Sequence, residues 1–520
     1  MGQGLKEHYE SLKNKRDPFL RRARKCALYT LPMMYPPEGN NKHTQYPTPY
    51  QSLGSRGVNN LASKLLLTLL PPNSPFFQLR VSDYTLQEMT GDEESRSEVE
   101  EALAKIERAV MTEIETNAIR VGVFEAMKHL LIAGNVLLYL PPEGGVQIFT
   151  LEQFIVRRDT SGNVLQILIK EETHPYTLSQ DVREACDIEE PQSDQDNENV
   201  EIYTSIERKS DEDKWKVHQE INNKTVPDSE GEYPLDKSPW LPLRLFKIDG
   251  EDYGRSFVEE YIGDLISLEN LQKAIVEGSA AAAKVLFMVK PNGVTKPKTL
   301  HDSNSGDVVT GDANEISVLQ MEKYNDFRVA NETIRDLKEQ LSFAFMLNTA
   351  IQRQAERVTA TEVRYMAQEL EDALGGIYSI LSQEFQLPLV KRLMHKMAKE
   401  NAIPQLPEDQ IKPSIVTGLE ALGRGHDLDK MEQFLKHLEP LGPEMLQMYM
   451  NIGDYIKRVG TSLGMDLSGL VKSEQQVQQE QQQKQMQQMV DQLGPQAVQQ
   501  MGGMAQKAMD QNQGQGANNG

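Results

Sequence analysis

The chain has 520 residues, enough for two to four packed domains, and its 55 basic and 77 acidic residues give a formal net charge of −22. This charge excludes a protein whose whole surface attracts nucleic acid, so any contact with DNA must be local. The two distant cysteines, Cys26 and Cys186, argue against a disulfide framework or a zinc site, while the polar N-terminus and the short apolar runs predict neither a signal peptide nor a membrane span.

The first 255 residues carry both helical and strand patterns. Apolar residues at helical spacing predict three helices, and runs of alternating or β-branched residues bounded by turn residues predict several strands. The helices are expected at Leu5–Leu28, Asn59–Leu70 and Ser97–Asn117, and the strands at Val136–Leu140, Phe154–Arg157, Val164–Lys170, Glu201–Ile206, Lys214–Val217 and Leu241–Phe246. This part is therefore α+β. An acidic stretch at 181–201 is predicted to be a surface excursion.

The first predicted helix carries a cluster of basic side chains, namely Lys13, Lys15, Arg16, Arg21, Arg22, Arg24 and Lys25. Two interpretations remain open. The cluster is either a solvated helix face or a contact to DNA or to an acidic neighbour.

The second half is mainly helical. Ser256 and Glu259 form a capping-box pattern that opens a long helix, which runs through Ala280–Ala283 and is expected to end at Pro291. A second helix has its apolar residues at spacings of three and four between Ile334 and Phe345. The intervening insertion is turn-rich, with strand-like segments at Asp307–Val309 and Ile316–Leu319.

Further helices are predicted towards the C-terminus. Thr359 and Glu362 form another capping box before a long helix, which Gly375 and Gly376 should weaken and Pro388 should kink or break. Another helical region begins at Asp427. The last forty residues are rich in Gln, Gly and Asn and are expected to be disordered or marginally helical.

No catalytic motif withstands inspection. The sequence contains no Gly-Lys pair, so it lacks the phosphate-binding loop GxxxxGK[ST], and none of its histidines begins HExxH. Gly460–Gly464 fits GxSxG, but helical residues precede it and no histidine follows it, which favours a helix end. Gly423–Asp429 is more simply a turn with an aspartate helix cap. We therefore expect no enzyme activity, no cofactor and no metal.

Four long stretches resemble one family. They are GVNNLASK at Gly57–Lys64, YGRSFVEEYIGDLISLENLQ at Tyr253–Gln272, the segment Arg357–Gln383 and VTGLEALGRGHDLDK at Val416–Lys430. In this order they are similar to portal proteins of short-tailed double-stranded DNA bacteriophages, over nearly the whole chain.

The resemblance implies a mainly helical α+β portal fold that assembles as a dodecameric ring. Its implied parts are the wing (1–255 and 359–424), stem helix 1 (256–290), the clip (291–325), stem helix 2 (326–347), the tunnel loop (348–358), the crown and barrel (425–480) and a tail (481–520). The ring would be the channel at a unique capsid vertex through which the genome is packaged and ejected.

The resemblance also implies partners and locations. The partners are further copies of the chain, the major capsid and scaffolding proteins, the terminase large subunit, tail adaptor and tail tube proteins, internal core proteins, and DNA bound without sequence preference. The protein would act in the virion after assembly in the host cytoplasm. The competing hypotheses are a non-channel tail adaptor or scaffold protein of the virion, and an enzyme of the packaging or hydrolase type, against which the missing motifs count.

Two sets of residues are candidates for contacts. A wall of like charge would keep DNA from sticking, with a few basic or polar side chains as local contacts, namely Arg353, Gln354, Arg357, Lys273 and Lys284. The alternative for both lysines is a salt bridge to an adjacent subunit, and for Arg357 packing at a helix start. Candidates for the docking surface of the clip are Asn292, Lys296, Lys298, His301 and Asp307.

Overall fold

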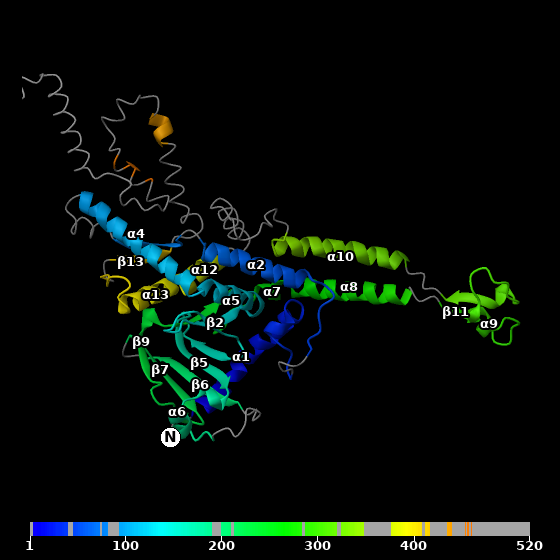
Figure 1. Ribbon diagram of the computed structural model, residues 1–520, viewed down its shortest axis with the longest axis horizontal. Helices are drawn as coiled ribbons and strands as arrows, with labels where there is room; N and C mark the ends of the chain where they lie inside the picture. Colours follow the sequence, from blue (N-terminus) through cyan, green and yellow to red (C-terminus); the bar gives the residue numbers. More distant parts are fainter. Residues whose placement is uncertain are drawn as a thin grey trace, which may run out of the picture. The chain divides into compact units, whose positions relative to one another are not determined.

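A computed structural model describes residues 4–39, 45–72, 75–81, 93–189, 199–209, 213–282, 286–319, 324–347, 376–407, 411–415 and 434–438, with four single positions between 453 and 459. The chain forms two compact units, Met1–Ala421 and Leu422–Gly520. Nearly all described residues belong to the first unit, which mixes helices and sheets (Figure 1). The α+β class is confirmed.

A six-stranded antiparallel sheet dominates the N-terminal part. Helix α1 packs against it through Leu5 and Tyr9, which meet Ile155, Leu168 and Tyr203 in a small separate cluster. Apolar residues on the opposite face, such as Ile167 and Ile206, join the main core. The helix is α1 (Leu5–Leu28), and the strands are β4 (Phe154–Arg158), β5 (Val164–Thr173), β6 (Val200–Arg208), β7 (Lys214–Ile221), β8 (Lys224–Thr225) and β9 (Gly231–Pro234), in the order β4-β5-β6-β7-β8 with β9 also on β7.

The main core is built around α5, which the sequence analysis did not predict. Because α5 is apolar on nearly every side, it lacks the one-sided pattern of a surface helix. It packs on α1, α2, α4 and α7 and on a three-stranded sheet of order β10-β2-β3. These elements are α2 (Leu53–Leu69), α4 (Glu93–Thr116), α5 (Ile119–Ala133), α7 (Phe257–Glu260), β2 (Asn135–Tyr139), β3 (Gln147–Phe149) and β10 (Trp240–Arg244).

Two long helices follow, with a hairpin insertion between them (Figure 1). They are α8 (Ile262–Ala282) and α10 (Tyr324–Ala344), and the hairpin insertion, residues 286–319, contains β11 (Leu286–Val289), α9 (Pro297–Asp302) and β12 (Ile316–Leu319). The expectation of a helix up to Pro291 is wrong, because Leu286–Val289 pairs with Ile316–Leu319 in an antiparallel hairpin. The strand-like reading of Asp307–Val309 is also wrong, since these residues lie in a loop.

The Ser256 cap is formed, but only on one side. The hydroxyl of Ser256 accepts a hydrogen bond of 2.9 Å from the backbone amide of Glu259. The Glu259 carboxylate turns instead to Arg22, at 3.2 Å, and to Arg255, at 3.5 Å. Both guanidinium groups also lie over the ring of Phe19. Arg22 of α1 and Arg255, the residue before the cap, have therefore replaced the second half of the capping box.

The described C-terminal part packs back on the core. Helix α12 (Ile377–Leu381) runs through a π-helical turn, Ser382–Gln386, into α13 (Leu387–Lys399). The wide turn lies just before Pro388, so the proline is accommodated without ending the helix. Strand β13 (Ile411–Ile415) pairs with β1 (Phe77–Val81), a long-range pairing that the sequence analysis missed.

Several expectations lie outside the described residues. They concern the tunnel loop 348–358, the helix from Thr359 up to Gly375, the segments Gly423–Asp429 and Gly460–Gly464, most of the helical region from Asp427, and the Gln-rich tail.

Candidate functional site

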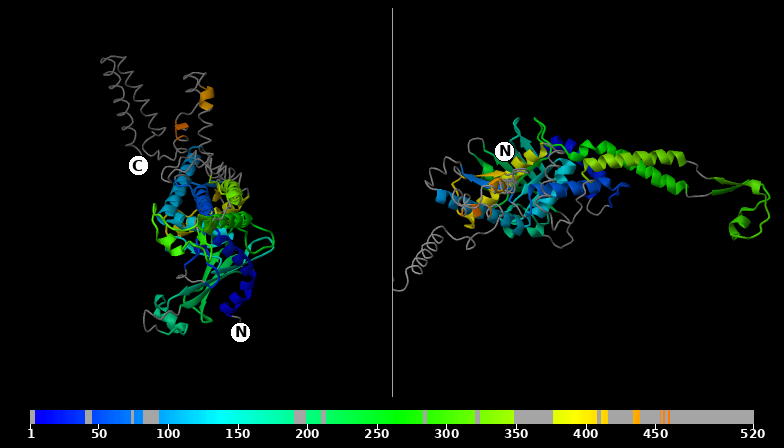
Figure 2. Two further views of the ribbon diagram at one scale, coloured as in Figure 1. Left: turned by 90° about the vertical axis from the view of Figure 1, so that its right-hand side faces the viewer. Right: turned by 90° about the horizontal axis from the view of Figure 1, so that it is seen from above.

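The two long helices α8 and α10 lie side by side and antiparallel in both views (Figures 1 and 2). At the end next to the core, Leu265 and Leu268 of α8 and Leu341 and Phe345 beside the end of α10 are fully buried. At the end next to the hairpin insertion, a Cβ atom on Gly278 would lie only 2.9 Å from the ring of Phe327. Glycine therefore allows the two helices to approach closely there.

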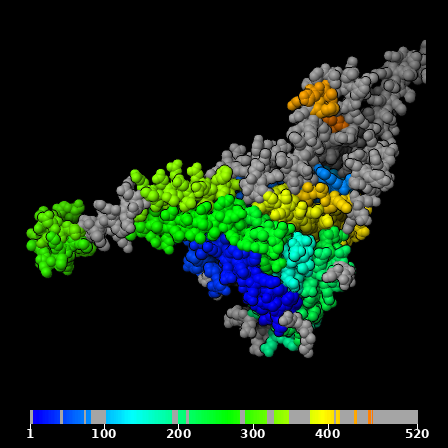
Figure 3. Space-filling view, turned by 180° about the vertical axis from the view of Figure 1, so that it is seen from behind, coloured from blue at the N-terminus to red at the C-terminus, as the bar shows by residue number. Residues whose placement is uncertain are grey.

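The outward faces of the two helices differ in character. The second half of α8, Ala274–Ala282, has Glu277 as its single charged residue, yet it exposes Val276 at 51% and several alanines. The exposed face of α10 carries charges of both signs, namely Arg328, Glu332, Arg335, Asp336, Lys338 and Glu339. Figure 3 shows the two surfaces side by side, α8 in green and α10 in yellow-green. A helix that is apolar on more than one face is usually covered on each of them.

Lys273 is the one candidate DNA contact that the structure describes. It is exposed on α8, and its ammonium lies 4.0 Å from the Glu277 carboxylate of the same helix. The phenol of Tyr50 donates to that carboxylate at 3.3 Å. One turn nearer the core, the Glu269 carboxylate accepts the backbone amides of Tyr50 and Gln51 at 2.9 and 3.0 Å. Glu269 and Glu277 thus hold residues 50–51 against α8, and Lys273 lies on the same side of the helix beside Glu277.

The other four candidates for DNA contact, Arg353, Gln354, Arg357 and Lys284, lie outside the described residues. The structure therefore neither gathers them with Lys273 nor separates them from it.

The five candidate docking residues of the hairpin insertion are all exposed. Asn292 adopts a left-handed backbone conformation at a turn, and Lys296 precedes α9, which contains Lys298 and His301. The Asp307 carboxylate accepts the backbone amide of Asn304 at 2.6 Å, so this residue shapes a loop. All five belong to the hairpin insertion, but within the part of the chain that the structure describes no hydrogen bond or ion pair joins them to one another.

Glu315 holds the tip of the hairpin insertion together, a role that the sequence analysis missed. Its carboxylate accepts the backbone amides of Val294 and Thr295 at 3.1 and 2.9 Å, and these bonds lower its pKa. The hydroxyl of Thr295 exchanges hydrogen bonds with the backbone of Asp312. Val294 and Val308 remain 75% and 102% exposed. The surface of the hairpin insertion is therefore apolar as well as charged.

The basic cluster of α1 divides into two groups. Arg16 is buried and donates to Tyr9 and to the carbonyl of Glu152, both at 2.7 Å. Arg22 pairs with Glu259, and Arg24 with Glu152 at 3.0 Å. In contrast, Lys15, Arg21 and Lys25 are exposed. Three arginines of the cluster thus bind partners within the chain. The two interpretations, a solvated helix face or a contact to DNA or an acidic neighbour, now concern only the exposed residues.

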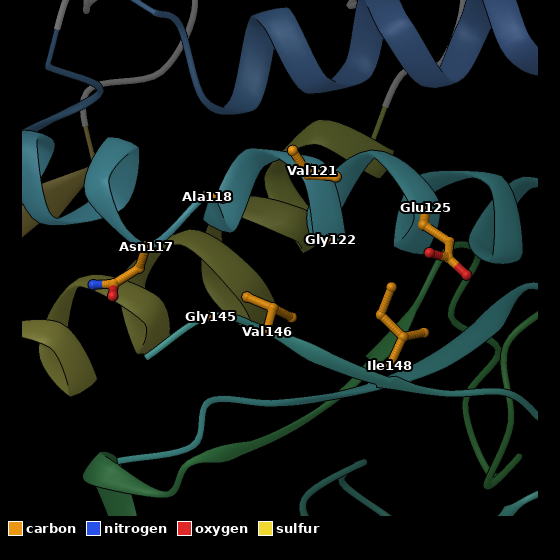
Figure 4. Close-up of a pocket in the computed structure, with 8 residues that line it drawn as sticks. All are labelled: Asn117, Ala118, Val121, Gly122, Glu125, Gly145, Val146 and Ile148. Carbon is orange, nitrogen blue, oxygen red and sulfur yellow. The ribbon is translucent and has the colours of Figure 1, made fainter. Parts of the chain in front are cut away.

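One open groove of about 500 Å³ lies between the start of α5 and β3 (Figure 4). Val121, Val146 and Ile148 give it apolar walls, with Glu125 near one end and Asn117 at the other. His129 lies 3.9 Å from the Glu125 carboxylate and lowers its pKa. His129 is buried and also bonded to Tyr35 at 3.0 Å, so this histidine is part of the core.

The described ranges contain no group of three or more His, Cys, Asp and Glu side chains that could hold a metal ion. Within the same ranges, no helix is long and apolar enough to cross a membrane. Cys26 and Cys186 are both buried and unbridged, and burial raises the pKa of the Cys26 thiol to about 11. Cys26 is therefore a protonated core residue at neutral pH.

Comparisons with known proteins identify the family. Residues 2–471 match the family described as bacteriophage head to tail connecting protein. The chain is 44% identical to the portal protein of Escherichia phage T7 over 480 residues, which cover 91% of this chain and 89% of the relative. It is 43% identical to the portal protein of Enterobacteria phage T3, with the same coverage, and 30% identical to that of Enterobacteria phage SP6 over 90% of both chains. The chain therefore belongs to the bacteriophage head-to-tail connecting family, the portal proteins of short-tailed phages.

Proposed function

We propose that copies of this chain close into a dodecameric ring, and that DNA passes through the ring during packaging and ejection. As a portal protein, the chain is a structural component of the virion at the vertex where head and tail join. Our proposal goes beyond this family role in three respects: the number of subunits in the ring, the residues that face DNA and the identity of the docking partners.

The observation that carries the proposal is the exposed apolar surface on the second half of α8, where Glu277 is the single charged residue. Ala274, Val276 and Ala280 expose apolar surface that α10 does not cover. In a closed ring with one heterologous contact, each subunit offers the same face to the next one. Side-by-side packing of α8 against the neighbouring subunit would bury this face, and it would leave the charged face of α10 in water.

Charge supports weak contact with DNA inside the ring. Each chain has a net charge of −22, so a ring of identical chains repels the phosphate backbone on average. We assign local contacts to Lys273, Lys284, Arg353, Gln354 and Arg357, where positive or polar groups would touch phosphates without reading bases. Glu277, at 4.0 Å from Lys273, moderates the charge of that lysine.

We further assign the parts implied by the family resemblance to segments of this chain. In this assignment, the stem is 256–290 and 326–347, which contain α8 and most of α10, and the clip is 291–325, which contains most of the hairpin insertion. The wing comprises 1–255 and 359–424, the tunnel loop is 348–358, and the crown and barrel lie within 425–480. The clip would dock the terminase large subunit during packaging and a tail adaptor afterwards, through Asn292, Lys296, Lys298, His301 and Asp307.

The remaining parts of the proposal concern other partners and chemistry. The ring would contact the major capsid, scaffolding and internal core proteins, would assemble in the host cytoplasm, and would have no enzymatic activity of its own. An ATPase assay on the purified ring tests the last point, because turnover by the pure protein would contradict it.

Ring formation is tested by native mass spectrometry of the purified protein, followed by imaging of the same sample. We expect a dodecamer of the 58.8 kDa chain, or a ring one subunit larger or smaller, with a central hole. A stable monomer or dimer at every salt concentration would overturn the channel.

The DNA contact is tested by reversing the charge of Arg353. Rings of Arg353→Glu should assemble, but genome packaging should fall, because a further acidic group would repel DNA inside the channel. Arg157→Glu is the matched control, since Arg157 is exposed on β4. Normal packaging with Arg353→Glu would remove this residue from the channel.

A further inference from the structure

Helix α2 contacts the chain on both sides of the segment 348–375. It contains the whole of GVNNLASK, the stretch Gly57–Lys64, for which the assigned functions give no role. One face of α2 meets the end of α10, and its C-terminal carbonyls meet the start of α12 and the π-helical turn. Two sites on one helix, eight residues or about 12 Å apart, therefore border this segment.

The first site is the C-terminal end of α10. The amide group of Asn60 donates to the carbonyls of Phe345 and Met346, both at 3.0 Å, and the buried ammonium of Lys64 donates to the Met346 carbonyl at 3.2 Å. The last carbonyls of a helix lack partners within the helix and carry partial negative charge. Side-chain donors and a positive charge from α2 thus satisfy the end of α10.

The backbone at this site is tightly specified. Met346 adopts a left-handed conformation with φ of 52°, and the amide of Leu347 returns to the carbonyl of Ser342 at 2.8 Å. A Cβ atom at Gly57 would come within 2.5 Å of the ring of Phe345. Gly57, Asn60 and Lys64 lie three and four residues apart, on one face of α2. We call these three residues the anchor face.

The second site is the C-terminal end of α2 itself. The phenol of Tyr378 donates to the carbonyl of Thr68 at 3.3 Å, and the buried amide of Gln386 donates to the carbonyl of Leu69 at 2.7 Å. Tyr378 lies in α12, two residues after Gly376, where the described chain resumes. Here the direction is reversed, since α2 supplies the acceptors.

We propose that α2 is the platform that fixes both ends of the segment 348–375, and that Asn60 and Lys64 are positioning residues for it. The inference rests on the proposed function, because that function places the tunnel loop in this segment. It goes further by naming the residues that set where the segment leaves the stem and where it returns. The stretch Gly57–Lys64 then acts on the channel without facing it.

Adjacent asparagines provide the first test. Asn60 reaches α10, whereas the side chain of Asn59 donates to the carbonyl of Ser55 in its own helix at 2.9 Å. Hydrogen exchange is followed in assembled rings at the amides of Phe345, Met346 and Leu347. In Asn60→Ala these amides should exchange about fivefold faster than in the parent protein, because the loss of one ordinary hydrogen bond, about 1 kcal/mol, corresponds to that factor. In Asn59→Ala their exchange rates should not change.

Equal exchange in the two variants would overturn the anchor, while leaving the ring and the proposed function intact. If Asn60→Ala fails to assemble, Gln386→Met tests the other end. It should accelerate exchange at Ile380, whose amide bonds to the carbonyl of Gly376 at the start of α12. Unchanged exchange at Ile380 in assembled rings would equally overturn the platform.

A functional measurement separates positioning from mere stability. Lys64→Met removes the donor at nearly constant length, and Lys64→Arg keeps a positive donor. In particles whose rings form normally, Lys64→Met should lower the fraction filled with DNA several-fold, with recovery in Lys64→Arg. Arg56→Met, on an exposed position of α2, is the control. If the fraction of particles filled with DNA is the same for all three variants, Lys64 is not a positioning residue.

Discussion

The body of the protein and its two long helices handle apolar surface in different ways. We take the body as the described residues from 4–260 and 376–415. In the body, α5 is surrounded by four helices and a sheet, and residues such as Leu130 and Leu137 are fully buried. In α8 and α10, by contrast, burial is concentrated near the body, and Val276, Val329 and Phe343 are 51%, 61% and 81% exposed.

This difference distinguishes apolar surface that a single chain buries when it folds from apolar surface that only a neighbouring subunit can bury. Burial of apolar area is the main favourable contribution to folding, so the body has its own core. Helices α8 and α10 bury apolar side chains where they contact each other, but other apolar side chains of both helices stay exposed. Exposed apolar surface of this kind is typical of a surface that a partner covers. Damage to the body should therefore lower the stability of each chain, whereas damage to the outer face of α8 should act on assembly.

The largest effect is expected for Val276→Asp. If a neighbouring subunit covers Val276, the new carboxylate is buried without a partner at every interface, at a cost of about 3 kcal/mol each. Rings should disappear in native mass spectrometry, while the circular dichroism of the body is retained.

Asn331→Asp is the matched control for this prediction. It adds the same charge to the exposed and already charged face of α10, where the carboxylate stays in water. Rings should persist in this variant. Intact rings with Val276→Asp would show that the outer face of α8 is not the contact between subunits, and the comparison between body and helices would then fail.

A smaller effect, on the body, is expected for Arg244→Met. Arg244 is 2% exposed and pairs at 2.5 Å with Glu384, in the π-helical turn. Removal of the arginine leaves a largely buried carboxylate without its counter-charge. The free energy of unfolding should fall by about 3 kcal/mol, the lower end for a broken buried pair, because Glu384 is 24% exposed. Urea unfolding at a fixed protein concentration measures it.

The double variant Arg244→Met, Glu384→Leu tests the cause. With both charges gone, most of the lost stability should return, to within about 1 kcal/mol of the parent protein. Nearby Arg158 gives a second indication. Burial, followed by the charge of Arg244, lowers its pKa to about 10, so removal of Arg244 relieves a repulsion. A double variant as unstable as the single one would place the loss in packing rather than in the ion pair.

The sequence predicted elements whose pattern is local and missed those that depend on distant partners. Helix α1 was predicted at the correct bounds, because its apolar residues lie on one side. Helix α5 lacks that one-sided pattern, and β1 and β13 are separated by more than three hundred residues, so no local pattern indicates their pairing. Leu286–Val289 followed a helical run of alanines, and only its partner strand decides its conformation.

The candidate site was predictable in outline rather than in detail. The structure exposes all five polar residues that the sequence analysis selected in the hairpin insertion, while docking through them stays a prediction. Glu315 and Lys64 escaped prediction as bonding residues because their partners are backbone groups. A backbone carbonyl leaves no mark in the side-chain sequence, so only the fold reveals such a contact.

The smallest effect is expected where α1 is tied to β6, the central strand of the six-stranded sheet. Glu201 accepts Lys170 at 2.6 Å and Lys6 of α1 at 2.9 Å, and these two lysines lower its pKa to about 2. An unfolded glutamate has a pKa of about 4.3. Because the folded value is the lower one, the pair stabilises the protein above pH ~4.3 and loses this contribution as the pH falls towards 2.

Glu201→Gln should therefore lower the free energy of unfolding at pH 7 by about 1 kcal/mol, since the carboxylate is 31% exposed and solvent screens the pair. The gap between the variant and the parent in urea unfolding should narrow between pH ~4.3 and 2. Glu232→Gln removes a more exposed pair with Lys209 and Lys214, and it should change stability less. A constant gap at every pH would mean that Glu201 acts through packing or neutral hydrogen bonds, such as the one from Tyr203. In that case the tie of α1 to the sheet would resemble the apolar body core more than a charged surface contact.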